Sequence, residues 1–193
     1  MRIVAGAFRG RVIAGPKGDA TRPTSDRVRE AVFSTLDQRF DVLGTARVLD
    51  MFAGSGALGL EALSRGAAAV TFVESARSAR DALTRNITAL GVRDVTTVDP
   101  RDAFRLAGTS ILGSPFSLLF LDPPYRIEPA RVRELLEGLA SASSLAPGAV
   151  VVYEHRTGVQ PDWPQGFRDA GQRVYGETTV SYALWHAEEE RTP

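Results

Sequence analysis

Four consecutive residues, Asp122-Pro123-Pro124-Tyr125, could do chemistry on a nucleic-acid base. Two prolines in a row stiffen the chain in an extended form, which holds the Asp122 carboxylate and the Pro123 carbonyl as a fixed pair of acceptors. Such a pair could grip the hydrogens of an exocyclic amine and turn its delocalised lone pair towards an electrophilic methyl group. Tyr125 could stack on a base rotated out of its neighbours. We interpret these residues as a candidate catalytic site; a Pro-Pro turn with Asp122 as a helix cap is the alternative.

A glycine-rich segment earlier in the chain could bind a cofactor. The residues Gly54-Ser55-Gly56-Ala57-Leu58-Gly59 follow an apolar run of strand length and precede a helical stretch. A Gly-x-Gly-x-x-Gly turn in that position lets the backbone approach a nucleotide-type ligand at the carboxyl end of a sheet. Glu74 ends the next apolar run, where a carboxylate could accept hydrogen bonds from both hydroxyls of a ribose. A tight turn beside an ordinary surface glutamate is the alternative.

The spacing of this segment does not separate a dinucleotide such as NAD from S-adenosylmethionine. A dinucleotide needs its phosphates at the helix N-terminus, whereas S-adenosylmethionine carries a sulfonium cation that a nearby carboxylate favours. Asp50, before the loop, mildly favours S-adenosylmethionine. The candidate cofactor residues around the loop are Asp50, Ala53, Gly54, Ser55, Gly56 and Glu74.

The chain from residue 46 onward alternates apolar runs of strand length with helical stretches. Apolar strands separated by helices predict a parallel sheet covered on both faces, as in doubly wound α/β folds. After residue 160, two strand-like runs separated by a turn predict a terminal antiparallel hairpin. The predicted strands are 48–52, 70–74, 95–98, 117–121, 149–153, 167–174 and 180–185, and the predicted helices are 57–65, 75–90, 100–107 and 128–142.

The first part of the chain differs from the rest in charge. The 193 residues carry no net charge, but residues 1–29 hold seven basic groups against Asp19 and Asp26. Lys and Arg side chains that neutralise phosphates supply most nucleic-acid affinity, so this segment is a candidate polyanion surface, with solvated surface as the alternative. The candidate phosphate-binding residues are Arg2, Arg9, Arg11, Lys17, Arg22, Arg27 and Arg29.

This basic segment also has its own pattern of elements. Short β-prone pieces within residues 2–13 predict a small hairpin, and the apolar spacing from Val28 to Phe40 predicts a helix. Arg27 and Arg29 fall on that helix, where intramolecular carboxylates or the cofactor are alternative partners. We expect an N-terminal hairpin and helix extension, with residues 1–23 as a basic hairpin extension and residues 24–193 as the main domain.

Composition excludes several classes of mechanism. The chain has no cysteine, which rules out disulfides, thiolate zinc sites and a cysteine nucleophile, and its two histidines give a metal site little support. No apolar stretch approaches the roughly 20 residues of a membrane helix, and Arg2 and Arg9 interrupt the apolar start. We expect a cytoplasmic protein that uses no metal and contacts no membrane.

The motifs together resemble a known family. The Asp122 to Tyr125 tetrapeptide with Phe52-Ala53-Gly54-Ser55-Gly56 resembles class I S-adenosylmethionine-dependent methyltransferases that act on exocyclic amines of bases. The stretch from Phe52 to Gly66 and the segment Thr21-Arg22-Pro23-Thr24-Ser25-Asp26-Arg27-Val28-Arg29-Glu30 look like the bacterial 16S ribosomal RNA guanine-N2 methyltransferase family. The likeness covers nearly the whole chain.

The resemblance implies a Rossmann-like, seven-stranded sheet and methylation of one guanine in 16S rRNA near the ribosomal P site, in an assembling or assembled small subunit. S-adenosylmethionine would be the methyl donor and S-adenosylhomocysteine the product. The N-terminal hairpin would help to recognise the substrate. The resemblance also implies an adenine contact from Asp102 or Ala103.

Two other functions remain open at this point. An adenine-N6 nucleic-acid methyltransferase shares the Asp-Pro-Pro-Tyr motif, but the chain lacks the roughly 100 further residues that a separate target-reading domain would occupy. A non-catalytic RNA-binding or ribosome-assembly factor could keep the fold, although the intact Asp122, Pro123 and Tyr125 argue against it. A methyl-transfer assay would separate these alternatives.

Overall fold

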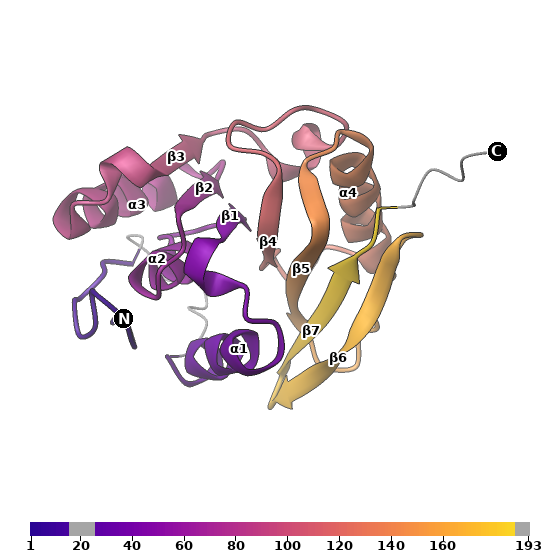
Figure 1. Ribbon diagram of the computed structural model, residues 1–193, viewed down its shortest axis with the longest axis horizontal. Helices are drawn as coiled ribbons and strands as arrows, with labels where there is room; N and C mark the ends of the chain where they lie inside the picture. The colour runs from indigo at the N-terminus through magenta and orange to yellow at the C-terminus, as the bar shows by residue number, and fades with distance from the viewer. Residues whose placement is uncertain (16–25, 188–193) are drawn as a thin grey trace.

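The computed structural model describes residues 1–15 and 26–187, which form a seven-stranded sheet with helices on both faces (Figure 1). The sheet order is β3-β2-β1-β4-β5-β7-β6; β1 to β5 run parallel, and β7 and β6 pair antiparallel at one edge. The predicted α/β fold with its C-terminal antiparallel hairpin is confirmed.

The strands are β1 (Arg47–Met51), β2 (Ala69–Val73), β3 (Thr96–Asp99), β4 (Phe116–Leu121), β5 (Leu145–Arg156), β6 (Phe167–Tyr175) and β7 (Thr178–Trp185). The α-helices are α1 (Asp26–Arg39), α2 (Ala57–Ser64), α3 (Arg77–Leu90) and α4 (Pro129–Ser141).

Both faces of the central strands are buried, because successive side chains point to opposite sides of the sheet. In β1, Val48 belongs to the core that contains residues of α1, α2 and α3, whereas Leu49 belongs to the core that contains residues of α4. In β4, Leu118 and Leu119 divide in the same way. Figure 1 shows α4 across the sheet from the other three helices. Burial on both faces explains the continuous apolar runs of these strands.

The order of the strands sets the position of the site. The chain passes from β1 outward to β2 and β3, then returns to β4, which pairs with the other side of β1. The connections after β1 and β4 lead to α2 and α4, which lie on opposite faces of the sheet. In α/β proteins, ligands bind at the carboxyl edge of the sheet between two such connections. The glycine-rich segment follows β1 and the tetrapeptide follows β4, so the sheet brings the two candidate sites together.

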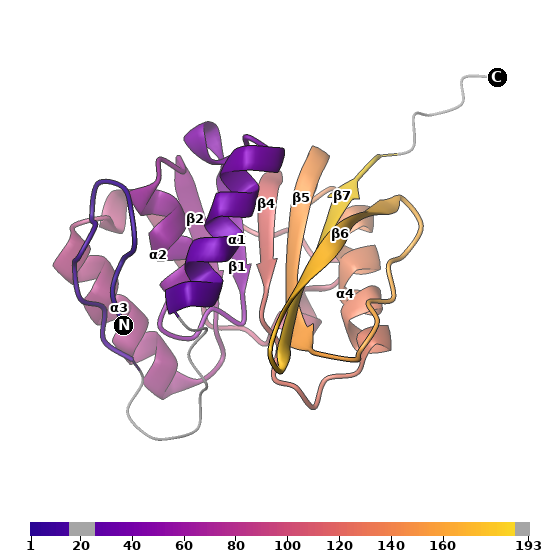
Figure 2. The same ribbon diagram turned by 90° about the horizontal axis from the view of Figure 1, so that it is seen from below.

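Residues 1–15 form a hairpin-like segment that is anchored to the main body. Arg2 and Val12 make an antiparallel bridge, and Ile3 and Ile13 are buried in the core shared with α1 to α3. Figure 2 shows the segment beside α2 and α3. The predicted boundary between residues 1–23 and 24–193 lies among residues 16–25, outside the described residues, and stays a prediction.

The predicted helix at 100–107 is shorter than expected. A 3-10 helix, Ala103–Leu106, occupies its centre, and the Asp102 carboxylate caps it by accepting a hydrogen bond from the Phe104 N–H at 2.9 Å. Pro100 precedes this turn and Gly108 follows it in the left-handed region, which leaves no room for a longer helix. Within the described ranges, no helix has the length and apolar character needed to cross a membrane.

Candidate functional site

The glycine-rich loop turns the chain from the end of β1 into α2. Phe52, Gly54 and Gly56 all have positive φ values, of 61°, 56° and 85°. A Cβ atom on Gly56 would lie 2.4 Å from the Leu83 side chain, so packing as well as φ requires glycine there. A Cβ on Gly54 would meet nothing within 4 Å, so there is open space beside the backbone at this residue.

Glu74 joins this loop to the loop after β2. One carboxylate oxygen accepts a hydrogen bond from the Gly54 N–H at 2.8 Å, and the other accepts from the Ala76 N–H at 2.7 Å. Each oxygen of a carboxylate has a further lone pair, so ribose hydroxyls could still donate to Glu74. The structure thus places the predicted acidic residue directly against the glycine-rich loop.

Asp50 lies beneath the loop rather than at its surface. Its side chain is 2% exposed, and it accepts a hydrogen bond from the Gly59 N–H in the first turn of α2 at 2.9 Å. Burial raises the pKa of Asp50 to about 7; the Gly59 N–H opposes this shift and the nearby Glu74 charge adds to it. Asp50 therefore holds the start of α2 in place, and its predicted role beside a sulfonium stays a prediction.

We expect Asp50→Asn to change the pH dependence of stability. The pKa is about 7 in the folded protein and 3.8 for an ordinary aspartate, so the folded state holds the proton more tightly. The stability that Asp50 contributes is complete below the unfolded pKa and is lost as pH rises through the folded pKa. Asparagine keeps an acceptor for the Gly59 N–H without the charge. Urea unfolding at about pH 5 and about pH 8 should show the variant gaining stability relative to wild type at the higher pH; an unchanged difference would contradict the raised pKa.

Two phenylalanines lie against each other beside the loop: Phe52, which begins the glycine motif but was not among the predicted cofactor residues, and Phe104, which was not predicted. The rings of Phe52 and Phe104 have centroids 5.4 Å apart, and the Arg131 guanidinium lies over the Phe104 ring at 5.0 Å. Asp102, with its exposed side chain, and the buried Ala103 directly precede Phe104. The predicted adenine contact from Asp102 or Ala103 therefore lies next to this aromatic pair. An aromatic residue directly before the glycine-rich segment was the signal available in the sequence.

The tetrapeptide leaves the carboxyl end of β4 between β1 and β5. Leu121, its preceding residue, pairs with Met51 of β1 and with Tyr153 of β5. Pro123 is buried and Pro124 is exposed. The Tyr125 side chain is 43% exposed, and its hydroxyl hydrogen-bonds the Thr178 Oγ1 of β7 at 2.8 Å, which fixes the direction of the ring.

A small open hollow lies beside the tetrapeptide. Its lining comes from the turn after β4 and from the end of β5. His155 at that end is structural: its Nε2 hydrogen-bonds the Ser181 Oγ at 2.8 Å, and burial lowers its pKa. The lining residues are Pro123, Pro124, Tyr125, Ile127, Tyr153, Glu154, His155, Arg156 and Val159.

The predicted phosphate-binding residues differ in how exposed their side chains are. Arg2, Arg9, Arg11 and Arg27 are exposed. The Arg11 guanidinium donates to the Ala89 carbonyl at the end of α3 at 2.6 Å, which lays this side chain along the helix end. Lys17 and Arg22 lie outside the described residues.

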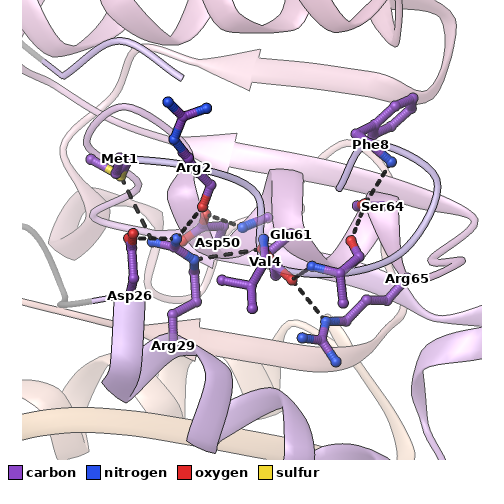
Figure 3. A network of polar contacts seen from close by, with 12 residues as sticks. Met1, Arg2, Val4, Phe8, Asp26, Arg29, Asp50, Glu61, Ser64 and Arg65 are labelled. Carbon is purple, nitrogen blue, oxygen red and sulfur yellow. Dashed lines mark hydrogen bonds and ion pairs between the residues drawn. The ribbon is translucent and has the colours of Figure 1, made fainter. Parts of the chain in front are cut away.

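Arg29 is a structural residue, which corrects its prediction as an RNA contact. Its side chain is fully buried; it donates to the Arg2 carbonyl and to the Asp26 carboxylate, the latter at 2.8 Å, and its Nε lies 3.6 Å from the Glu61 carboxylate (Figure 3). A buried guanidinium with these partners cannot reach RNA phosphates. The sequence anticipated intramolecular carboxylates as the alternative for this residue.

Glu61 is the centre of the same polar network and was missed by sequence reasoning. Its fully buried carboxylate accepts from the N–H groups of Val4 and Ala5, at 2.7 and 3.0 Å, and from Arg65 Nε at 2.9 Å. One turn further along α2, Ser64 accepts from Phe8 N–H through its Oγ at 2.9 Å. Figure 3 shows α2 holding the N-terminal segment through these contacts. The helix that begins at the glycine-rich loop therefore also fixes residues 1–15.

The strand order, the antiparallel β7 and the glycine-rich loop define a Rossmann-like methyltransferase fold. A solved structure from Salinibacter ruber, an RNA methyltransferase in complex with S-adenosyl-L-homocysteine, has this fold, with a TM-score of 0.65 and 19% identity, covering 88% of this chain and 97% of that one. The yhhF structure from Escherichia coli superposes with a TM-score of 0.84 and 34% identity over 97% of this chain and 99% of that one.

The sequence places the chain within one family of this fold. The chain belongs to the family described as conserved hypothetical protein 95, which matches residues 1–184. It is 35% identical over 189 residues to ribosomal RNA small subunit methyltransferase D of Escherichia coli K12, an alignment that covers 97% of this chain and 90% of the relative. The expected family resemblance is confirmed.

Proposed function

We propose that this protein transfers a methyl group from S-adenosylmethionine to the exocyclic N2 of a specific guanine in 16S rRNA. The substrate is an assembling or assembled small ribosomal subunit in the cytoplasm. The observation that carries the proposal is the position of Asp122-Pro123-Pro124-Tyr125 beside the glycine-rich loop at one edge of the sheet. The name of the Escherichia coli relative supports rRNA as the substrate.

The residues around the glycine-rich loop fit S-adenosylmethionine. The open backbone at Gly54 admits a ligand, and Glu74 offers carboxylate oxygens to ribose hydroxyls at the same place. Phe52 and Phe104 offer apolar ring surface for an adenine. S-adenosylmethionine, when bound, supplies a methyl group on a sulfonium, and the reaction needs no metal or covalent intermediate.

The tetrapeptide performs the acceptor side of the reaction. Asp122 and the Pro123 carbonyl accept hydrogen bonds from the two amine hydrogens, which concentrates the lone pair on the nitrogen and directs it at the methyl carbon. The amine must lose one proton after transfer, and the Asp122 carboxylate is in place to receive it. Tyr125, held at its hydroxyl by Thr178, stacks on the guanine ring. Holding the reactants in line accounts for much of such a rate enhancement.

We expect Glu74→Ala to weaken S-adenosylmethionine binding about tenfold or more, because hydrogen bonds to a charged group contribute roughly 1.5 to 3 kcal/mol. The same change removes the hydrogen bond that Glu74 accepts from the Gly54 N–H, and this loss should also weaken cofactor binding. Isothermal titration calorimetry measures the change, with the exposed Glu137→Ala as a control that should bind like wild type. Unchanged affinity of the Glu74 variant would remove this residue from the site.

We also expect the basic N-terminal segment to bind RNA phosphates. A variant with Arg9→Ala, Arg11→Ala and Lys17→Ala should bind 16S rRNA more weakly and with a flatter salt dependence, and each lost contact should lower the log-log slope by roughly 0.7 to 0.9. Arg168→Ala with Arg173→Ala, on the exposed face of β6, is the matched control. A wild-type slope for the triple variant would mean that the segment is solvated surface, and S-adenosylmethionine affinity should be the same in all three proteins.

Methyl transfer to three substrates tests the proposed activity. Labelled S-adenosylmethionine is incubated with unmodified small subunits, naked 16S rRNA and duplex DNA. The proposal expects label in the ribosomal substrates and none in DNA. Label in DNA would favour the adenine-N6 alternative, and no transfer to any substrate would favour a non-catalytic assembly factor.

A further inference from the structure

We propose that Glu154, at the carboxyl end of β5, is the residue that makes the site specific for guanine, by accepting a hydrogen bond from the ring N1–H beside the reacting amine. The inference rests on the proposed function and deepens it, because it concerns the same site. The observations are the position of Glu154 beside Asp122, its burial, and its place in the lining of the hollow next to Tyr125.

The register of the sheet places Glu154 next to Asp122. Leu121, the last residue of β4, pairs with Tyr153 of β5, so Asp122 leaves the end of β4 beside the position that Glu154 occupies on β5. Phe120 and Val152 precede them by two residues and both belong to the core under α1 to α3, so Asp122 and Glu154 continue the same face of the sheet. Adjacent strands lie about 4.8 Å apart, a distance that a base edge can span.

The surroundings of Glu154 suit recognition of a base rather than of solvent. Glu154 is only 9% exposed, so a base that meets its carboxylate does so away from bulk solvent. The hollow beside it is also lined by Pro123 and Tyr125, which contact the target base in the proposed reaction. In the proposed arrangement, the base stacks on Tyr125 with its amine at Asp122 and its N1 edge, rather than its N3 edge, towards β5.

The chemistry of the two purines then makes the carboxylate selective. In guanine, N1 is one of the two ring nitrogens that flank the reacting amine, and it carries a hydrogen, so N1–H and N2–H present adjacent donors to carboxylate oxygens. In adenine, the ring N1 is an acceptor. Its lone pair would face a lone pair of the Glu154 carboxylate, and the two would repel each other. A site built to hydrogen-bond a substrate N–H discriminates strongly against analogues that lack it. Glu154 thus separates guanine from adenine at a motif that both kinds of enzyme share.

The test uses a base that keeps the reacting amine but lacks the N1–H. Small subunits are reconstituted with 16S rRNA into which a synthetic segment is ligated, with guanine or 2-aminopurine at the methylated position. 2-Aminopurine has the amine on C2, but its ring N1 is an acceptor and it also lacks the O6 of guanine, so the effect is assigned to Glu154 by comparison with the variant below. Wild-type protein should methylate 2-aminopurine with a kcat/KM about tenfold or more below that for guanine, the factor expected for a charge-assisted hydrogen bond.

The variant Glu154→Gln should change this preference. Its carboxamide can donate to the ring N1 of 2-aminopurine, so the ratio of kcat/KM for guanine to that for 2-aminopurine should shrink by about tenfold or more, while S-adenosylmethionine affinity stays at the wild-type value. Glu128→Gln, an exposed glutamate just after the tetrapeptide, is the matched control and should keep the wild-type ratio. Glutamine preserves the shape of glutamate, and thermal unfolding verifies that the variant is folded.

Each outcome separates the inference from the proposed function. A wild-type ratio in folded Glu154→Gln protein would overturn the role of Glu154 while leaving guanine methylation intact. If wild-type protein methylates no guanine substrate at all, the proposed function itself fails. A variant that loses activity on both bases equally, with unchanged cofactor affinity, would assign Glu154 a merely structural role and also overturn the inference.

Discussion

Asp122→Ala is expected to abolish turnover on small subunits while S-adenosylmethionine affinity stays nearly at the wild-type value. Asp122 acts on the target amine in the proposed reaction, so its loss removes a contact that is strongest in the transition state and should appear in the chemical step. Removal of one such polar contact in other enzymes lowers kcat by about 100- to 1000-fold. Single-turnover kinetics with saturating subunits measure this step directly.

The matched comparison for this variant is Glu74→Ala. That change should weaken cofactor binding with a smaller effect on the single-turnover rate at saturating S-adenosylmethionine, because Glu74 contacts the ribose in our proposal. Opposite patterns in the two variants would separate the cofactor and base halves of the site. A near-normal single-turnover rate for Asp122→Ala would show that the acceptor-pair mechanism is wrong.

Glu61→Ala is expected to lower the free energy of unfolding by about 3 to 5 kcal/mol, the usual effect of removing one partner of a buried ion pair. The change removes the carboxylate that lies beside the buried Arg29 guanidinium, and it leaves the Val4 and Ala5 N–H groups without their acceptor. Equilibrium urea unfolding measures the difference. Glu134→Ala, in an exposed ion pair on α4, is the control and should cost about 1 kcal/mol or less. Equal effects in the two variants would contradict the structural role of Glu61.

A pair of glycines tests the attachment of the N-terminal segment without removing a charge. Gly6 and Gly10 have nearly the same φ, 82° and 81°, so alanine is strained equally at both. A Cβ on Gly6 would lie 1.7 Å from the Ser64 carbonyl oxygen, whereas a Cβ on Gly10 meets nothing within 4 Å. Gly6→Ala should therefore detach the segment from α2 and weaken 16S rRNA binding, while Gly10→Ala should bind like wild type. Equal binding by both variants would show that the attachment does not position the segment for RNA.

The sequence predicted the sheet and the meeting of the two motifs because both depend on local patterns. Buried parallel strands read as continuous apolar runs, and loops after β1 and β4 must lie together in this strand order. The prediction of a helix at 100–107 was less accurate, because Pro100 and the Asp102 cap confine the helix to one short turn. Propensity over a short window does not include such end effects.

Long-range pairing of polar groups could not be predicted in the same way. Arg27 and Arg29 are both arginines of the basic N-terminal segment, two residues apart. Arg27 is exposed, whereas Arg29 faces the core and meets Glu61 on α2. The hydrogen bond between Tyr125 and Thr178, and the β4–β5 register that brings the end of β4 beside Glu154, likewise join segments that are distant in sequence. The spacing of residues along one helix or strand indicates which face a residue occupies. Identifying the residue that it contacts on another element requires the tertiary structure.

Identification of the methylated nucleoside tests the central claim most directly. Unmodified small subunits are incubated with labelled S-adenosylmethionine and the protein, and the 16S rRNA is then digested to nucleosides and analysed by mass spectrometry. We predict that the label is recovered as N2-methylguanosine, that mapping places it at one position, and that Asp122→Ala produces none. Recovery of the label as N6-methyladenosine, or at many positions, would contradict the proposed reaction.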